Sequence, residues 1–176
     1  YQYFSYINSS DNIVDGGDGN DSVVGNMYFS LGDLTLRGGD GDDSVSLQIS
    51  ASNYSLYGNP AQTIVGTLEG GVGNDTLTVN APRLAADYPV STNIDAGSGD
   101  DSVSITKTVS TATLGSGTDF ISITDSVSTV TLGEGSDTIK PAPLANQPLK
   151  LITVTDFVAG TGGDRIDLSA LANLFI

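Results

Sequence analysis

The sequence predicts an all-β protein, a right-handed parallel β-solenoid or β-roll whose coils stack along one axis. Three observations predict it: a glycine- and aspartate-rich turn recurs six times, its flanks alternate between apolar and polar residues, and the closest copies lie 18 residues apart. A turn repeated in one fixed phase is typical of a solenoid. The alternative, an antiparallel sandwich, gives its loops no reason to repeat.

The repeated turn reads Gly-x-Gly-x-Asp, and an aliphatic residue follows two positions after the aspartate. An apolar residue also stands three positions before the first of these glycines in every copy. Four copies match each other closely, whereas the last two begin with Leu114 and Leu132 and are eroded. The copies span residues 16–23, 38–45, 70–77, 96–103, 114–121 and 132–139.

Short strands are expected after each turn, because apolar residues there alternate with Ser or Thr at period two. The polar residues take the outward positions of these strands. No Asn-Gly hairpin signal joins neighbouring strands, so the strands should pair with those of other coils. The inward residues include Val45, Leu47 and Ile49, then Leu77 and Val79, Val103 and Ile105, and Ile121 and Ile123.

One coil should hold two strands and two turns, since the segments after Asp101 and Asp119 align without a gap over 18 residues. The acidic turns would then share one edge of the solenoid. Plain turns around residues 106–110 and 124–128 would share the other edge. In the longer coils, residues 51–62 and 83–92 would bulge from the sides or the plain edge, leaving the acidic turns in register.

Composition excludes several classes of function. The 176 residues carry 21 acidic and 6 basic side chains for a net charge of -15, so nucleic acid is an unfavourable partner. The absence of Cys excludes disulfides and thiolate zinc sites, and the absence of His removes the commonest general base. No apolar run reaches the roughly 20 residues of a membrane span.

Stacked acidic turns create an electrostatic problem that a cation would solve. Coils about 4.8 Å apart would bring aspartates together, with a repulsion of roughly 3 kcal/mol per pair at an effective dielectric of 20. Oxygen ligands without His or Cys select Ca²⁺, and Mg²⁺ fits less well because it keeps its waters. The predicted column is Asp21, Asp43, Asp75, Asp101, Asp119 and Asp137, with Asp18, Asp40, Asp42 and Asp100 adding charge.

The turn resembles the RTX nonapeptide, Gly-Gly-x-Gly-x-Asp-x-aliphatic-x, over residues 12–140. The resemblance implies that the sixth-position aspartates bind Ca²⁺ together with loop carbonyls, here those of Gly16, Gly38 and Gly70 and their neighbours. RTX rolls usually carry the acidic loop on both edges, whereas this chain carries it on one. We therefore expect one column of about five ions between successive turns, strongest among the first four turns.

The flanking segments complete a four-part organisation. Residues 1–11 are expected to form an N-terminal strand or cap, or to continue an upstream region, and residues 141–149 form a Pro-rich connector. Residues 150–176 are similar to the segment that follows RTX repeats in type I secretion substrates, and would also cap the open end of the solenoid. Asp156-Phe157 and Asp164-Arg165-Ile166-Asp167-Leu168-Ser169 carry this resemblance.

The resemblance implies a non-catalytic, calcium-binding structural module of a secreted or cell-surface bacterial protein. It would stay unfolded at low cytosolic Ca²⁺, pass the type I secretion machinery, and fold in extracellular Ca²⁺. The charge argument by itself supports only the folding switch.

Two alternatives remain open. One is a surface-layer or adhesin component that self-associates or contacts polysaccharide, and the seven tyrosines could form a sugar-binding face. The other is a polysaccharide-acting β-helix enzyme. Such an enzyme usually requires a cationic base near a carboxylate cluster. The six basic residues do not fall at matching positions of the repeat, so they are not expected to converge. They are Arg37, Arg83, Lys107, Lys140, Lys150 and Arg165.

Overall fold

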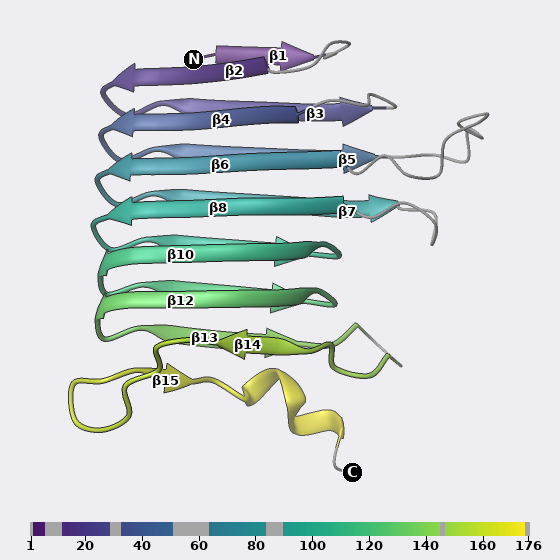
Figure 1. The fold of residues 1–176 in the computed structure, drawn as a ribbon, viewed down its shortest axis with the longest axis vertical. Helices are drawn as coiled ribbons and strands as arrows, with labels where there is room; N and C mark the ends of the chain where they lie inside the picture. Colours follow the sequence, from purple (N-terminus) through teal and green to yellow (C-terminus); the bar gives the residue numbers. More distant parts are fainter. Residues whose placement is uncertain are drawn as a thin grey trace.

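The computed structural model describes residues 2–5, 12–28, 33–50, 64–83, 90–144 and 147–174. The chain is a β-solenoid, as the sequence predicted. Its described strands form an eight-stranded and a seven-stranded sheet, and every pairing within them is parallel. Successive strands alternate between the two sheets, so each coil adds one strand to each layer (Figure 1).

The strand order follows the direction of stacking in both layers. The eight-stranded sheet runs β1 (Gln2–Ser5), β3 (Ser22–Tyr28), β5 (Ser44–Ser50), β7 (Thr76–Arg83), β9 (Ser102–Thr106), β11 (Phe120–Thr124), β13 (Thr138–Ala142) and β15 (Arg165–Ile166). The seven-stranded sheet runs β2 (Asn12–Asp18), β4 (Asp33–Asp40), β6 (Ile64–Val72), β8 (Val90–Ser98), β10 (Val109–Gly117), β12 (Val127–Gly135) and β14 (Ile152–Val154).

The register between coils confirms the predicted coil of 18 residues. Val109 pairs with Val127 and Ala112 with Val130, while Ile105 pairs with Ile123. The longer coils keep the acidic turns in register too, through the aligned glycines 17, 39, 71, 97, 115 and 133.

Most of the residues expected to bulge from the longer coils lie outside the described part of the chain, at 51–63 and 84–89. The ends of the second expected bulge belong to strands instead: Arg83 closes β7, and β8 begins at Val90. Among the tyrosines, Tyr3 and Tyr28 lie in strands, and the other five fall outside the described residues.

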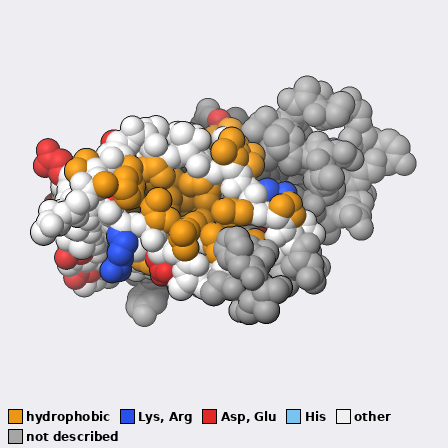
Figure 2. All heavy atoms as spheres, turned by 90° about the horizontal axis from the view of Figure 1, so that it is seen from below, with side chains coloured by type: hydrophobic (Ala, Val, Ile, Leu, Met, Phe, Trp, Pro, Cys, Tyr) orange, Lys and Arg blue, Asp and Glu red, His pale blue; other side chains and the backbone are white. Residues whose placement is uncertain are grey.

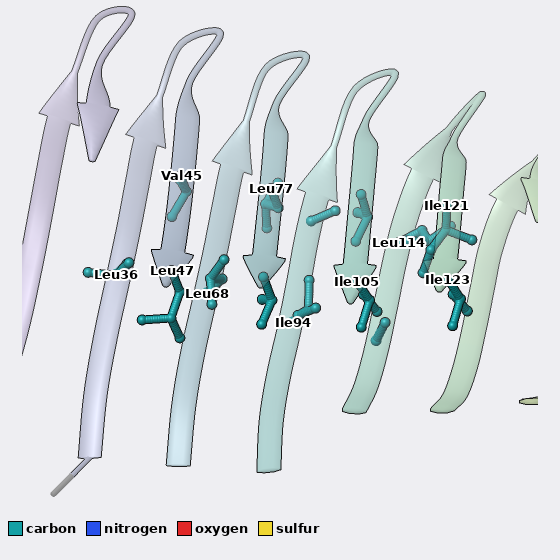
Figure 3. Packing of buried hydrophobic residues seen from close by; sticks show 14 of the residues in the cluster. Leu36, Val45, Leu47, Leu68, Leu77, Ile94, Ile105, Leu114, Ile121 and Ile123 are labelled. Atoms are coloured by element: carbon teal, nitrogen blue, oxygen red, sulfur yellow. The ribbon is translucent and has the colours of Figure 1, made fainter. Parts of the chain in front are cut away.

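The core is a ladder of aliphatic side chains between the two sheets. Leu36, Leu68 and Leu114 of one layer and Leu47 and Ile123 of the other point into this space (Figure 3). All five side chains are buried. Complete burial of such a side chain contributes roughly 1.5–3 kcal/mol, so the repeated inward positions supply the main stabilisation of each coil.

The plain edge differs from the strands after the acidic turns, where Ser and Thr face outward as expected. Ser110, Thr92 and Thr108 are buried, and their hydroxyls form a hydrogen-bonded chain, with Thr92 to Ser110 at 2.6 Å and Thr108 to Ser110 at 2.5 Å. Val109 and Val127 are exposed instead. Ala112 and Leu114 fix the alternation of β10, so the residue two positions before Ala112 must also point inward.

The C-terminal segment closes the stack. β14 pairs with β12 and β15 pairs with β13, and a 3₁₀-helix, η1 (Ser169–Leu174), follows. Seen from this end, apolar side chains gather in the middle of the molecule (Figure 2). A groove of about 320 Å³ there is lined by residues that include Ile139, Leu149 and Ile166. Among the described residues no helix is long and apolar enough to cross a membrane.

Candidate metal site along the acidic turns

The glycine-rich turns stack on one edge of the solenoid with their backbones in contact. Gly39 and Gly41 have φ of 117° and 133°, a region that side chains other than glycine rarely occupy. A Cβ on Gly39 would collide with the carbonyl of Gly17 in the preceding turn. The Gly41 N–H donates to the carbonyl of Val72 at 2.7 Å, so each turn is fastened to the next.

The six aspartates predicted to form a column do so. Asp43, Asp75, Asp101, Asp119 and Asp137 are each at most 3% exposed, and Asp21 at the N-terminal end is half-buried. In each pair of neighbours, the backbone N–H of one aspartate donates to Oδ1 of the aspartate in the next coil. The five bonds, from Asp21 to Asp137, measure 2.7–2.8 Å.

The second carboxylate oxygen in this column is the unusual feature. The Oδ2 atoms of Asp43, Asp75, Asp101, Asp119 and Asp137 are buried, and none has a hydrogen-bond partner. An ionised carboxylate buried with one oxygen unsatisfied is costly, because burial removes water without replacing its hydrogen bonds. A folded protein that keeps five such oxygens in a row requires a cation or a proton beside them.

In the first three turns, a second oxygen converges with Oδ2 at the first glycine. The position that a Cβ on Gly16 would take lies 3.0 Å from Oδ2 of Asp21 and 2.5 Å from the carbonyl oxygen of Gly38. At Gly38 the same position meets Oδ2 of Asp43 and, at 2.6 Å, the carbonyl oxygen of Gly70. At each glycine, a carboxylate oxygen and the carbonyl oxygen of the next coil thus approach so closely that they leave no room for a side chain.

The third such convergence is at Gly70, where a Cβ would meet Oδ2 of Asp75 at 2.6 Å and also contact the carbonyl oxygen of Ala96. We call these three convergences of oxygens, at Gly16, Gly38 and Gly70, the glycine cradles. In the later turns the aligned positions hold Ala96, Leu114 and Leu132, whose side chains are buried in the core. A side chain therefore stands beside the remaining aspartates, where the first three turns have only glycine.

The other predicted ligands lie outside the column. Asp42 and Asp100 belong to a second ladder on the exposed side of the turns, in which side-chain oxygens accept backbone N–H groups of the following coil. The acceptors are Asn20, Asp42, Asn74 and Asp100, at 2.7–3.0 Å. Asp18 and Asp40 are exposed and aligned with each other at the ends of β2 and β4. An open polar groove of about 420 Å³ runs along the first three turns, between the two ladders.

One member of the column was missed at the sequence level. The Asp137 N–H donates to Oδ1 of Asp164 at 3.1 Å, and the Val158 N–H donates to Oδ2 of Asp164 at 2.7 Å. Both oxygens of Asp164 are satisfied, so the column of unsatisfied oxygens ends here. The signal was present: Gly160, Gly162, Asp164 and Ile166 reproduce the Gly-x-Gly-x-Asp-x-aliphatic spacing.

Burial changes the acidity of the column. Desolvation, opposed by the backbone hydrogen bond from Asp75 and reinforced by the charges of Asp119 and Asp75, raises the pKa of Asp101 to about 7. Desolvation likewise raises the pKa of Asp75, Asp119 and Asp137. Without a cation, these carboxyl groups hold protons more tightly than ordinary aspartates do.

The donor set fits a hard cation in one particular way. Within the described residues, no three acidic side chains converge on a single point, so carboxylates alone would not complete a coordination shell. Carboxylate and carbonyl oxygens do converge at the glycine cradles, and this mixture of ligands is the one that Ca²⁺ accepts. No protein-family model matches the chain, and no curated protein or solved structure proved similar to it.

Proposed function

We propose that the chain is a non-catalytic structural module that binds Ca²⁺ between its acidic turns and folds as it does so. The observation that carries the proposal is the row of buried, unpartnered Oδ2 atoms, two of which, on Asp43 and Asp75, face a carbonyl oxygen at a glycine cradle. Bound Ca²⁺ would supply positive charge to these buried oxygens and tie neighbouring coils together.

The residues at the cradles have distinct tasks in this proposal. Asp43 uses Oδ1 to accept the Asp21 N–H, which holds its carboxylate in place and leaves Oδ2 directed at the cradle. Gly38, which has no side chain, allows the two oxygens to approach each other, and Gly70 contributes its carbonyl oxygen from the next coil. Because the two oxygens belong to different coils, a cation held by both favours the stacked state over the unstacked one.

The number of well-formed sites follows from the cradles. We assign the strongest binding to the cradles at Gly16, Gly38 and Gly70. The turns that begin with Ala96, Leu114 and Leu132 have a side chain at the cradle position, and protonation of their buried aspartates is the competing way to remove charge. The expected column of about five ions thus becomes three favoured positions.

The proposal includes secretion because the turns and the C-terminal segment resemble those of RTX proteins. A chain with a net charge of -15 repels itself when metal-free, which favours an unfolded state at low Ca²⁺. Millimolar extracellular Ca²⁺ would then drive folding after export through a type I system. The module would serve a secreted or cell-surface protein.

The test is a Ca²⁺ titration followed by far-UV circular dichroism, with a chelator at the start and Mg²⁺ as the comparison ion. We expect a cooperative gain of β-structure with Ca²⁺ and a much weaker response to Mg²⁺ at the same concentration. A chain that is already fully β-structured in chelator at neutral pH, and whose unfolding midpoint does not move with Ca²⁺, would refute the proposal.

A further inference from the structure

The outward face of the seven-stranded sheet carries a regular array of threonines. One column runs along the sheet in direct register through Thr35, Thr67, Asn93, Thr111, Thr129 and Thr153. A second column begins at the C-terminal half, where Thr113 pairs with Thr131 and the Thr131 hydroxyl lies 2.9 Å from that of Thr155. β10 and β12 therefore each present Thr-x-Thr side by side, and Thr153 of β14 with Thr155 just beyond its end continues the pattern. The three strands are neighbours in the sheet (Figure 1).

This part of the face carries no charge in an otherwise strongly acidic chain. Residues 109–114 and 127–132 contain only Val, Ser, Thr, Ala and Leu. The outward residues are the two exposed valines and the threonines, of which Thr111, Thr113 and Thr129 are exposed. Nearer the N-terminus the second column is charged, with Arg37 paired to Glu69 at 2.6 Å, so the uncharged array has a defined boundary.

The spacing of the array is fixed in two directions. Neighbouring strands place aligned threonines about 4.8 Å apart, and threonines two residues apart on one strand lie about 6.7 Å apart. Threonine is β-branched and stiff at χ1, so its methyl and hydroxyl groups hold one arrangement on a sheet better than serine would. The parallel stacking of rigid coils keeps this arrangement from coil to coil.

The partner that matches a flat, uncharged, two-dimensional grid of hydroxyl and methyl groups is ordered water. On the prism faces of hexagonal ice the oxygens repeat at slightly less than the strand spacing and slightly more than the two-residue spacing. Hydroxyl groups can take lattice positions, and methyl groups favour the ordered water shell around them. A charged face would instead bind water in a geometry set by each charge.

We infer that the threonine face of β10, β12 and β14, extended by the first column toward Thr35, is an ice-binding surface. Many weak contacts on one rigid body act together, because the first contact raises the effective concentration of the rest. The opposite sheet provides a comparison surface of mixed composition, because the outward positions of β9 and β11 hold Ser104 and Ser122 in one column and Thr106 and Thr124 in the next.

The experiment uses the whole chain in Ca²⁺, under conditions where circular dichroism shows it folded. We would measure the fraction of protein taken into a slowly growing ice hemisphere and the shape of single ice crystals in a nanolitre cryoscope. The expected result is at least severalfold enrichment in ice over a solute such as serum albumin, and faceted crystals. No enrichment and round crystals would overturn the inference.

Variants on the two sheets test which face of the solenoid binds ice. Thr129→Tyr, in the middle of the array, should reduce enrichment to the level of the albumin control, whereas Ser122→Tyr on the opposite sheet should leave it unchanged. The milder Thr129→Ser, which keeps the hydroxyl but frees χ1, should lower enrichment severalfold without disturbing the fold. Loss of ice uptake in Ser122→Tyr with full uptake in both Thr129 variants would overturn the assignment to this face.

Discussion

Replacing Asp101 by Asn tests whether the buried carboxylates of the column are unfavourable when no Ca²⁺ is bound. Asp101 is 2% exposed, and its Oδ1 accepts the Asp75 N–H at 2.7 Å, a bond that the amide oxygen of Asn would keep. The substitution removes one buried negative charge and little else. In chelator we therefore expect Asp101→Asn to stabilise the folded state at neutral pH.

The magnitude follows from the raised pKa. The pKa of Asp101 rises from 3.8 to about 7 on folding, mainly through desolvation. A shift of one unit corresponds to 1.36 kcal/mol, so keeping this carboxylate ionised at pH 7 costs about 4 kcal/mol relative to the unfolded chain. The amide N–H group of Asn, left without a partner, would offset about 1–3 kcal/mol of the cost that is removed. The net stabilisation of the folded state is then about 1–3 kcal/mol.

The assay is urea unfolding followed by circular dichroism, in chelator and in saturating Ca²⁺, with a folding osmolyte added where the parent chain is unfolded. Asp95→Asn is the matched control, since Asp95 is exposed on the outer face of β8 and also loses one negative charge. If Asp101→Asn were destabilising in chelator, or equal to Asp95→Asn, the argument that burial of this carboxylate is unfavourable would be wrong.

Three further predictions address the cradles, the titration of the column and the cap. Gly38→Ala should weaken Ca²⁺ binding at least tenfold in calorimetry, because the methyl group would collide with both oxygens and push them apart, whereas Ala96→Gly should leave binding intact or add a site. Equal affinities for the parent and Gly38→Ala would contradict this. The raised pKa values mean that the folded state binds more protons than the unfolded state, so the free energy of unfolding in chelator should fall from about pH 4 to pH 7. Ca²⁺ affinity should rise over the same range, because the metal must displace these protons. A free energy of unfolding that does not change with pH in chelator would contradict this prediction. Asp164→Ala should lower the free energy of unfolding by about 2 kcal/mol in urea titrations, because the N–H groups of Asp137 and Val158 lose their acceptor; no change would show that the cap contributes nothing.

Much of the architecture could be predicted from the sequence because each coil of a solenoid repeats the same residue pattern. The Gly-x-Gly-x-Asp phase fixes the turns, and the period-two pattern around residues such as Val103 and Ile121 fixes which side chains face inward. The alignment of the six aspartates followed from these two facts. Asn20 and Asn74 stand within the repeated turns, and the structure adds that their side chains accept backbone N–H groups of the following coil.

Other features depended on contacts that no local pattern contains. The burial of Ser110 at the plain edge follows from the alternation set by Ala112 and from hydroxyl partners on neighbouring coils. Asp156 was assigned to a secretion-type segment, and in the structure its two oxygens accept the N–H groups of Leu132 and Gly133 at 2.8 Å. This carboxylate satisfies donors at an otherwise open sheet edge. Such pairing across 23 and 24 residues requires knowing how the chain returns to the last coil.

The measurement that tests the central claim most directly is a crystal structure of the chain grown in Ca²⁺, with anomalous scattering used to locate the ions. The account predicts ions at the three glycine cradles, each contacting Oδ2 of Asp21, Asp43 or Asp75 and a carbonyl oxygen of the following coil. Fully folded coils with no anomalous density at the cradles, or with ions bound only to exposed carboxylates such as Asp18 and Asp40, would contradict it.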